Sequence, residues 1–141
     1  MRMSRKTAAL LAAVASFAAA GVAIAADGAT TVTVDPATTL LPGDTAPFDA
    51  AGVRAVRKGK AIPAGYRLIG QHVKIARGRP AAGAALHFVC PGAKRLRTFG
   101  VTGKIGAAVT DDNYVRHRST WVRTYETGGP GADGTVYAVC R

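Results

Sequence analysis

Short segments in which apolar and polar residues alternate recur along most of the chain. Alternation with a period of two places every second side chain on one face of a strand, so each segment is typical of a half-buried β-strand. Turn-forming residues separate these segments about every eight to twelve residues. We therefore expect strands over 30–34, 66–69, 72–75, 84–90, 95–101, 104–109, 114–118, 120–126 and 135–140.

Short strands and frequent turns favour an all-β protein, a small antiparallel β-sandwich or barrel. No segment after the N-terminus shows the three-four spacing of apolar residues that an amphipathic helix requires. Thr102-Gly103 predicts a tight turn, and the glycine-rich residues 128–134 predict a loop before the last strand.

The N-terminal region differs from the rest. A short basic stretch, residues 1–6, precedes an apolar run over 8–26 that ends in small residues at Ala23 and Ala25. These are the regions of a secretory signal peptide, so we predict cleavage that leaves a secreted chain beginning near Ala26 or Asp27, without a transmembrane segment. An uncleaved membrane anchor is the alternative, because the run is nearly long enough to span a bilayer.

Residues 26–50 contain aspartates and prolines but no Lys or Arg. Pro36, Pro42 and Pro47 exclude a helix and confine any strand to the edge of a sheet. The predicted organisation is therefore a signal peptide over 1–25, an acidic extended arm over 26–50 and one β domain over 51–141.

The predicted β domain begins with a long basic region. Residues 51–110 contain twelve Lys or Arg and no Asp or Glu, within a chain of formal net charge +11. Without the signal peptide, 16 basic and 8 acidic residues remain, a net charge of +8. Such an imbalance attracts polyanions, although it is equally typical of a solvated surface without a partner.

The chain has two cysteines, Cys90 and Cys140, and each ends a predicted strand. In an exported protein this pair predicts a disulfide, which would join the last strand to one in mid-chain. A closed loop of about 50 residues would stabilise the fold by about 4 kcal/mol. Two buried thiols or a metal pair are the alternative.

Candidates for catalysis or metal binding are few and scattered. Ser119 is the one serine after the signal peptide and lacks the glycines of a nucleophile elbow. His72, His87 and His117 lie on separate predicted strands without metal-ligand spacing. Glu126 is the only glutamate, so no carboxylate pair indicates glycoside hydrolysis. We predict no catalytic residue, no metal site, no cofactor and no enzymatic activity.

One predicted strand carries a candidate binding surface. Trp121, Arg123 and Tyr125 are spaced by two residues and so project from one face, with Val122 and Thr124 on the other. If exposed, that face offers two rings and a cation for stacking; if buried, the rings belong to the core. The pattern leaves both interpretations open.

Arginines on neighbouring predicted strands extend this surface into a cationic face. It favours a non-catalytic secreted protein that binds acidic cell-envelope or extracellular polymers. No nucleic-acid motif is present and aromatic residues are few, so dedicated nucleic-acid binding is not expected. The alternative is a small secreted inhibitor or effector that binds a protein partner through the 128–134 loop; the oligomeric state is open. The candidate ligand-binding residues are Arg95, Arg97, Arg116, Arg118, Trp121, Arg123 and Tyr125.

The segments around the two cysteines form a recognisable pattern. Cys90-Pro91-Gly92 opens it, and Val136-Tyr137-Ala138-Val139-Cys140 closes it. Over about the last 55 residues, this resembles a pattern in uncharacterised exported β-domain proteins of high-GC Gram-positive bacteria. The resemblance implies a bracketing disulfide and a β domain, but no activity. The chain departs from the pattern at Lys94-Arg95-Leu96-Arg97, where those proteins often carry a glycine run, so no ligand role carries over to that stretch.

Overall fold

The computed structural model describes residues 22–24, 31–76, 83–109, 118–127 and 131–141. This part of the chain forms nine β-strands. None of its segments is a helix long and apolar enough to cross a membrane. The strands are β1 (Val22–Ile24), β2 (Val32–Val34), β3 (Thr38–Leu40), β4 (Arg67–Ala76), β5 (Gly83–Val89), β6 (Leu96–Lys104), β7 (Gly106–Val109), β8 (Ser119–Tyr125) and β9 (Gly131–Cys140).

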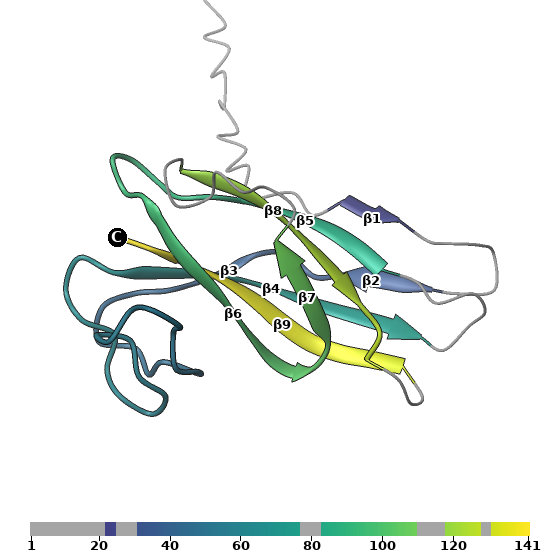
Figure 1. Cartoon of the computed structure of the whole chain (residues 1–141), viewed down its shortest axis with the longest axis horizontal. Coiled ribbons are helices and arrows are strands. Elements are labelled where there is room, and N and C mark those ends of the chain that lie inside the picture. Colours follow the sequence, from purple (N-terminus) through teal and green to yellow (C-terminus); the bar gives the residue numbers. More distant parts are fainter. Residues whose placement is uncertain (1–21, 25–30, 77–82, 110–117, 128–130) are drawn as a thin grey trace, which may run out of the picture.

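The strands form two antiparallel sheets that pack face to face (Figure 1). The four-stranded sheet has the order β1-β5-β8-β7. In the five-stranded sheet, β2 and β3 pair with successive parts of β4, and β9 lies between β4 and β6. The prediction of a small antiparallel β-sandwich or barrel closed by one disulfide is therefore confirmed, and the structure is the sandwich of the two.

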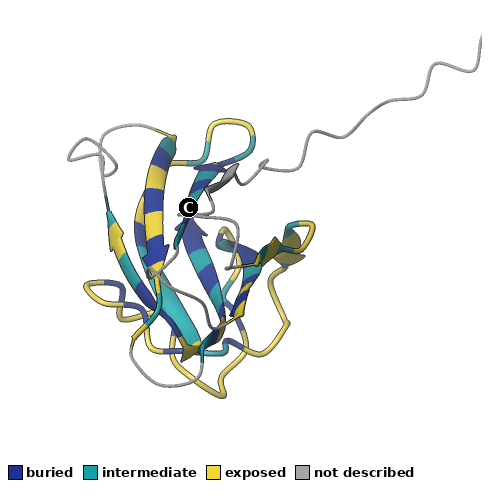
Figure 2. Ribbon diagram, turned by 90° about the vertical axis from the view of Figure 1, so that its right-hand side faces the viewer, coloured by how far each residue is buried: buried dark blue, intermediate teal, exposed yellow. Residues whose placement is uncertain are grey.

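The main core lies between the two sheets. Leu86, Phe88 and Val122 from the four-stranded sheet pack against residues such as Val73 and Val136 of the five-stranded sheet. All five side chains are fully buried. Buried positions alternate with exposed positions along β8 and mostly with half-buried positions along β5, which gives the striped ribbons of Figure 2. The period-two pattern of the sequence thus follows from one dry and one wet face.

A second core lies on the outer face of the five-stranded sheet. Residues 41–66 run across this face and place Phe48, Val56 and Ile62 against Leu68 of β4 and Val139 of β9. Leu68 and Val139 face away from the main core, because the residues next to them, Ile69 and Ala138, belong to that core. At this end the five-stranded sheet is therefore buried on both faces.

The extended arm expected over 26–50 is not separate from the β domain. Its described residues supply β2 and β3, which pair with β4, and Ala46 and Phe48, which are buried in the second core. The prolines fit this arrangement because Pro36 lies between the two short edge strands and Pro42 lies after them. The prolines excluded a helix and confined any strand to a sheet edge, and β2 and β3 both pair with β4 at one edge of the five-stranded sheet.

Three predicted boundaries also differ from the structure. The strands expected over 66–69 and 72–75 are one strand, β4, in which Gly70 lies under the Tyr137 ring. Thr102-Gly103 is not a turn, since β6 continues to Lys104 with Gly103 at a φ of +82°. The loop expected over 128–134 is shorter, because residues 131–134 already form β9 and pair with β4, and Asp133 and Gly134 also pair with β6. Residues 128–130 lie outside the described residues.

The predicted disulfide between Cys90 and Cys140 is confirmed, with a Cα–Cα distance of 5.6 Å. Cys90 follows β5 and Cys140 ends β9, so the bond joins the four-stranded sheet to the five-stranded sheet. A disulfide within a small domain indicates an oxidising, extracytoplasmic location.

Candidate functional site

Strand β8 presents Trp121, Arg123 and Tyr125 on the outer face of the four-stranded sheet. Thr120 and Val122 point into the core, whereas Trp121 and Tyr125 are 38% and 48% exposed. The prediction that the three side chains share one face is therefore consistent with the burial pattern of β8. The sequence left open whether this face is buried, and the structure shows that it is exposed.

Neighbouring strands position the two rings. Trp121 lies opposite His87 of β5, and the two rings stack with centroids 4.5 Å apart and an interplanar angle of 17°. Tyr125 lies opposite Gly106 of β7, where any Cβ atom would overlap the tyrosine ring. The absence of a side chain at Gly106 therefore lets the ring lie against the sheet. We call His87, Trp121, Arg123 and Tyr125 the aromatic face.

Arg123 lies between the two rings along β8 and is exposed. Its cross-strand neighbours are Ala85 on β5 and Ala108 on β7. Both neighbours are short side chains, so nothing bulky stands beside the arginine on the adjoining strands. A ligand lying across the sheet can therefore reach the guanidinium group while it contacts the rings.

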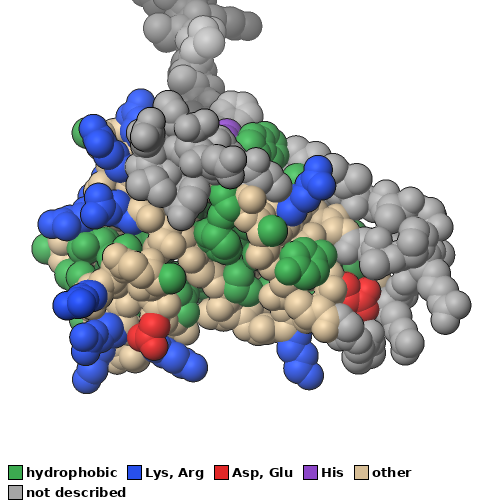
Figure 3. Space-filling model, viewed as in Figure 1, with side chains coloured by type: hydrophobic (Ala, Val, Ile, Leu, Met, Phe, Trp, Pro, Cys, Tyr) green, Lys and Arg blue, Asp and Glu red, His purple; other side chains and the backbone are tan. Residues whose placement is uncertain are grey.

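A second group of candidate residues gathers at the end of the sandwich that carries the disulfide. Arg95 and Arg141 exchange two backbone hydrogen bonds of 2.8 and 2.9 Å, and Cys90 donates one of 2.6 Å to the carbonyl of Arg118. Figure 3 shows Lys and Arg side chains concentrated at the left end, where Figure 1 places the C-terminus. We call the following residues the cationic end: Lys94, Arg95, Arg97, Arg118 and Arg141.

Three cations of this end make contacts that orient them without neutralising them. The Lys94 ammonium donates a 2.5 Å hydrogen bond to the carbonyl of Gly65, and the Arg118 guanidinium donates to the carbonyl of Gly92. The Arg141 guanidinium lies over the Tyr66 ring, 5.2 Å from its centroid. Carbonyl and ring partners carry no net charge, so the positive potential of this end remains.

Within the described part of the chain, no Lys or Arg forms an ion pair with a carboxylate; both ion pairs involve His72. Other carboxylates bind the backbone instead. Asp44 accepts a hydrogen bond of 2.7 Å from the N–H of Leu41, and Asp49 accepts one of 2.8 Å from the N–H of Lys58. Among the described residues, no carboxylate therefore lies within ion-pair distance of the cationic end.

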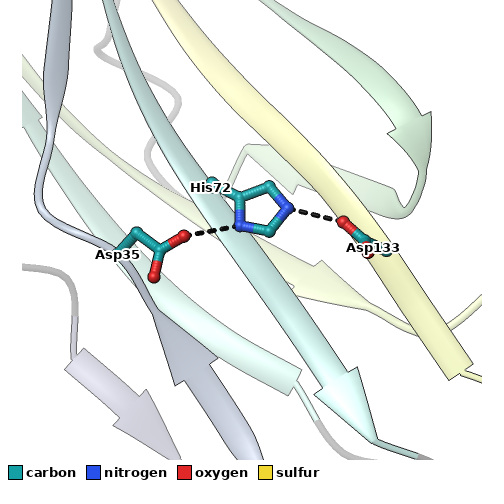
Figure 4. A network of polar contacts seen from close by, with 3 residues as sticks. All are labelled: Asp35, His72 and Asp133. Carbon is teal, nitrogen blue, oxygen red and sulfur yellow. Dashed lines mark hydrogen bonds and ion pairs between the residues drawn. The ribbon is translucent and has the colours of Figure 1, made fainter.

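His72 on β4 forms a network that the sequence did not reveal (Figure 4). Its Nδ1 lies 2.8 Å from a carboxylate oxygen of Asp35, just after β2, and its Nε2 lies 2.5 Å from one of Asp133 on β9. Three segments far apart in sequence are joined by one ring. No spacing rule could find this network, because β2, β4 and β9 meet only in the folded sheet.

The two carboxylates favour the protonated form of this ring. The hydrogen bond to Asp133 raises the pKa of His72 above its ordinary value of 6.5; partial burial opposes the rise, and Asp35 adds to it. The carboxylates lie on opposite sides of the ring, so they cannot converge on one ion (Figure 4). Among the described residues, no group of three His, Cys, Asp or Glu side chains is placed to hold a metal.

The predicted site residues form two surfaces instead of one. Trp121, Arg123 and Tyr125 belong to the aromatic face, whereas Arg95 and Arg97 belong to the other sheet, at the start of β6. Arg118 precedes β8 and lies at the cationic end. Arg116 lies outside the described residues, as does His117. Three residues of these surfaces were not among the predicted site residues: His87, Lys94 and Arg141. Neighbours on other strands cannot be identified from the sequence until the strand register is known.

Comparison with models of known protein families, with curated proteins and with solved structures found no match. The resemblance to exported β-domain proteins of Gram-positive bacteria therefore remains a prediction. The candidate function must be argued from the two surfaces alone.

Proposed function

We propose that this protein is a secreted, non-catalytic domain that binds acidic polymers of a cell envelope or of the extracellular space. The observation that carries the proposal is the cationic end: five Lys and Arg side chains gather beside the disulfide, and none forms an ion pair with a carboxylate of the described chain. Cations grouped at one end of a domain create a local potential that attracts polyanions.

The shape of the charge distribution favours a polymer over a small anion. Arg95, Arg97 and Arg141 lie on neighbouring strands β6 and β9 or directly beside them, and Arg118 reaches the same end from β8. A chain with repeated negative groups can contact several of these cations at once, and each further contact is intramolecular once the first has formed. Single anions gain no such advantage.

The location suits this role. The disulfide indicates an oxidising compartment, and the predicted signal peptide over 1–25 would direct the chain there. Outside a cell, acidic polysaccharides and teichoic-type polymers offer densely spaced negative charges. The large net positive charge of the chain supports attraction to such polymers.

Salt dependence tests the proposal. Binding to polygalacturonate and to polyphosphate, measured by isothermal titration calorimetry, should weaken steeply between about 50 and 200 mM NaCl, because each contact releases condensed counterions. Absence of binding at low salt, or binding that salt leaves unchanged, would overturn the proposal.

A matched pair of variants locates the contacts. Arg95→Gln with Arg97→Gln should weaken binding of both polymers and reduce the slope against salt by about two units. Lys74→Gln with Lys104→Gln removes the same charge at the far ends of β4 and β6, so it serves as the control. An equal loss of affinity in the two double variants would show that net charge, and not the cationic end, drives binding.

A further inference from the structure

We infer that the aromatic face is a carbohydrate-binding subsite that selects carboxylated sugars within the acidic polymers proposed above. The inference rests on that proposed function and adds a chemical class of ligand to it. Sugar rings would stack on Trp121 and Tyr125, and a carboxylate would bind the Arg123 guanidinium.

The exposure of the rings is the first observation behind this inference. The only tryptophan of the chain is 38% exposed, and Tyr125, on the same face, is 48% exposed. Large side chains of this kind usually fill the interior, and grouped exposed aromatic side chains mark interaction sites. Trp121 and Tyr125 are not part of the main core, because aliphatic residues and Phe88 fill the space between the sheets.

The second observation is that both rings are already held in place. Trp121 stacks on His87, and Tyr125 lies against the bare backbone of Gly106. A ligand that stacks on them therefore immobilises little that is not already ordered, and less conformational entropy is lost on binding. His87 covers one face of the Trp121 ring and Gly106 one face of the Tyr125 ring, and the opposite face of such a ring suits the apolar C–H face of a pyranose.

Arg123 supplies the selectivity for charge. Its guanidinium can bind a carboxylate through two parallel hydrogen bonds, which is the geometry that arginine favours. The short side chains of Ala85 and Ala108 leave it accessible from both adjoining strands. No carboxylate of the described chain lies within ion-pair distance of it.

The spacing indicates an oligosaccharide. Tyr125 lies four positions after Trp121 on the strand, which puts their Cα atoms about 13 Å apart, with Arg123 midway. A monosaccharide cannot span that distance, whereas consecutive sugars of one chain can. A single-stranded nucleic acid fits less well, because it carries a phosphate at every nucleotide and this row offers one cation between the rings.

The test compares polygalacturonate with one polymer that has the same sugar without the charge and with one that has the charge without the sugar. Polygalacturonate, its methyl-esterified form and polyphosphate are titrated against the full chain at one salt concentration. We expect the Trp121→Ala variant to bind polygalacturonate about tenfold more weakly and to bind polyphosphate as the parent does. Arg123→Gln should lose most of the preference for polygalacturonate over the methyl ester. The double variant Arg95→Gln with Arg97→Gln should bind both polyanions more weakly than the parent does.

Several outcomes would overturn the inference. The first is that Trp121→Ala and Trp121→Leu both bind polygalacturonate as tightly as the parent. The second is that these variants lose as much affinity for polyphosphate as for polygalacturonate. A single-stranded oligonucleotide that the parent binds more tightly than polygalacturonate, with a loss on Trp121→Ala, would assign the face to nucleic acid. Thermal unfolding verifies that each variant is folded. If the parent binds neither polyanion, the proposed function fails; if it binds both and the tryptophan variants change nothing, only this inference fails.

Discussion

The outer faces of the two sheets differ in what covers them. Residues 41–66 cover one end of the five-stranded sheet and bury Phe48 against it, whereas the aromatic face of the four-stranded sheet carries Trp121 and Tyr125 in contact with solvent. In both places an aromatic ring lies over a glycine of a neighbouring strand, Gly100 under Phe48 and Gly106 under Tyr125. The same packing of an aromatic ring over a glycine therefore occurs in a core on one sheet and on an exposed surface of the other.

This difference separates aromatic residues that stabilise the fold from those available to a ligand. Phe48 is enclosed by Val56, Ile62 and their neighbours, so its removal leaves a cavity. Trp121 stacks on His87 and is 38% exposed, so its removal leaves a site that solvent can reach. Alternation along the strands cannot distinguish the two cases, because it says nothing about what lies on the outer face of a sheet.

Breaking the covalent link between the two sheets should have the largest effect. Replacing Cys90 and Cys140 together with alanine should lower the free energy of unfolding by about 4 kcal/mol, because the unfolded chain is no longer constrained by a loop. Urea denaturation of the variant and the oxidised parent measures the difference. A loss below about 1 kcal/mol would show that the packed sheets hold together without the bond.

Phe48→Ala probes the covered face and should lower the free energy of unfolding by about 3 kcal/mol, through lost burial and the cavity that remains. Denaturant unfolding gives the value. Polymer binding by the folded variant, measured at low temperature, should equal that of the parent. A cost near zero would mean that residues 41–66 contribute little to the stability of the sheet.

Gly100 and Gly106 differ in how freely the aromatic ring above each of them can move. Gly100→Ala should cost about 2 kcal/mol because the buried Phe48 ring cannot move aside. Gly106→Ala should cost clearly less, since the exposed Tyr125 ring can rotate into solvent. Thermal unfolding of the two variants side by side measures the difference, and equal costs would contradict the distinction between the faces.

Trp121→Ala should lower the free energy of unfolding by about 1 kcal/mol or less, chiefly through loss of the His87 stack. Chemical denaturation measures it, with Phe48→Ala as the matched aromatic truncation on the other sheet. A cost equal to that of Phe48→Ala would show that Trp121 acts as a core residue.

The smallest effect concerns pH and His72. Because its pKa is raised in the folded state, the stability it contributes is fully present below the unfolded value of 6.5 and is lost as the pH rises through the folded value. Since the ring is partly exposed, we expect about 0.5 kcal/mol between pH 5.5 and 8.5. His72→Gln should remove this part of the pH dependence, measured as the difference in unfolding free energy between variant and parent. An identical pH profile in both would contradict the role of the network.

The sequence predicted the fold class because the information is local. Alternation along β5, β8 and β9 indicated the strands, and two cysteines allow only one pairing. The spacing along β8 also placed Trp121, Arg123 and Tyr125 on one face, but it did not show whether that face is exposed. The boundaries were less predictable at glycines: Gly70 interrupts the pattern of β4 only because a ring from β9 occupies its place, and that ring belongs to a residue far along the chain.

The candidate site was predictable only in part, for the same reason. The row of Trp121, Arg123 and Tyr125 lies on one strand and could be found from spacing. Which other residues join it depends on strand order, and this order separates Arg95 and Arg97 from the row and adds His87. The His72 network depends on three strands at once.

The position of β9 has a consequence for how this molecule is made. It is the last strand of the sequence, yet β4 and β6 join the five-stranded sheet by pairing with its two edges along most of its length. A chain that emerges from a ribosome or a translocation channel in order of synthesis holds β4 and β6 without their shared neighbour until residues 131–140 arrive. Assembly of the described sheet therefore waits for residues 131–140, and until they arrive the edges of β4 and β6 that pair with β9 lie open to other strands.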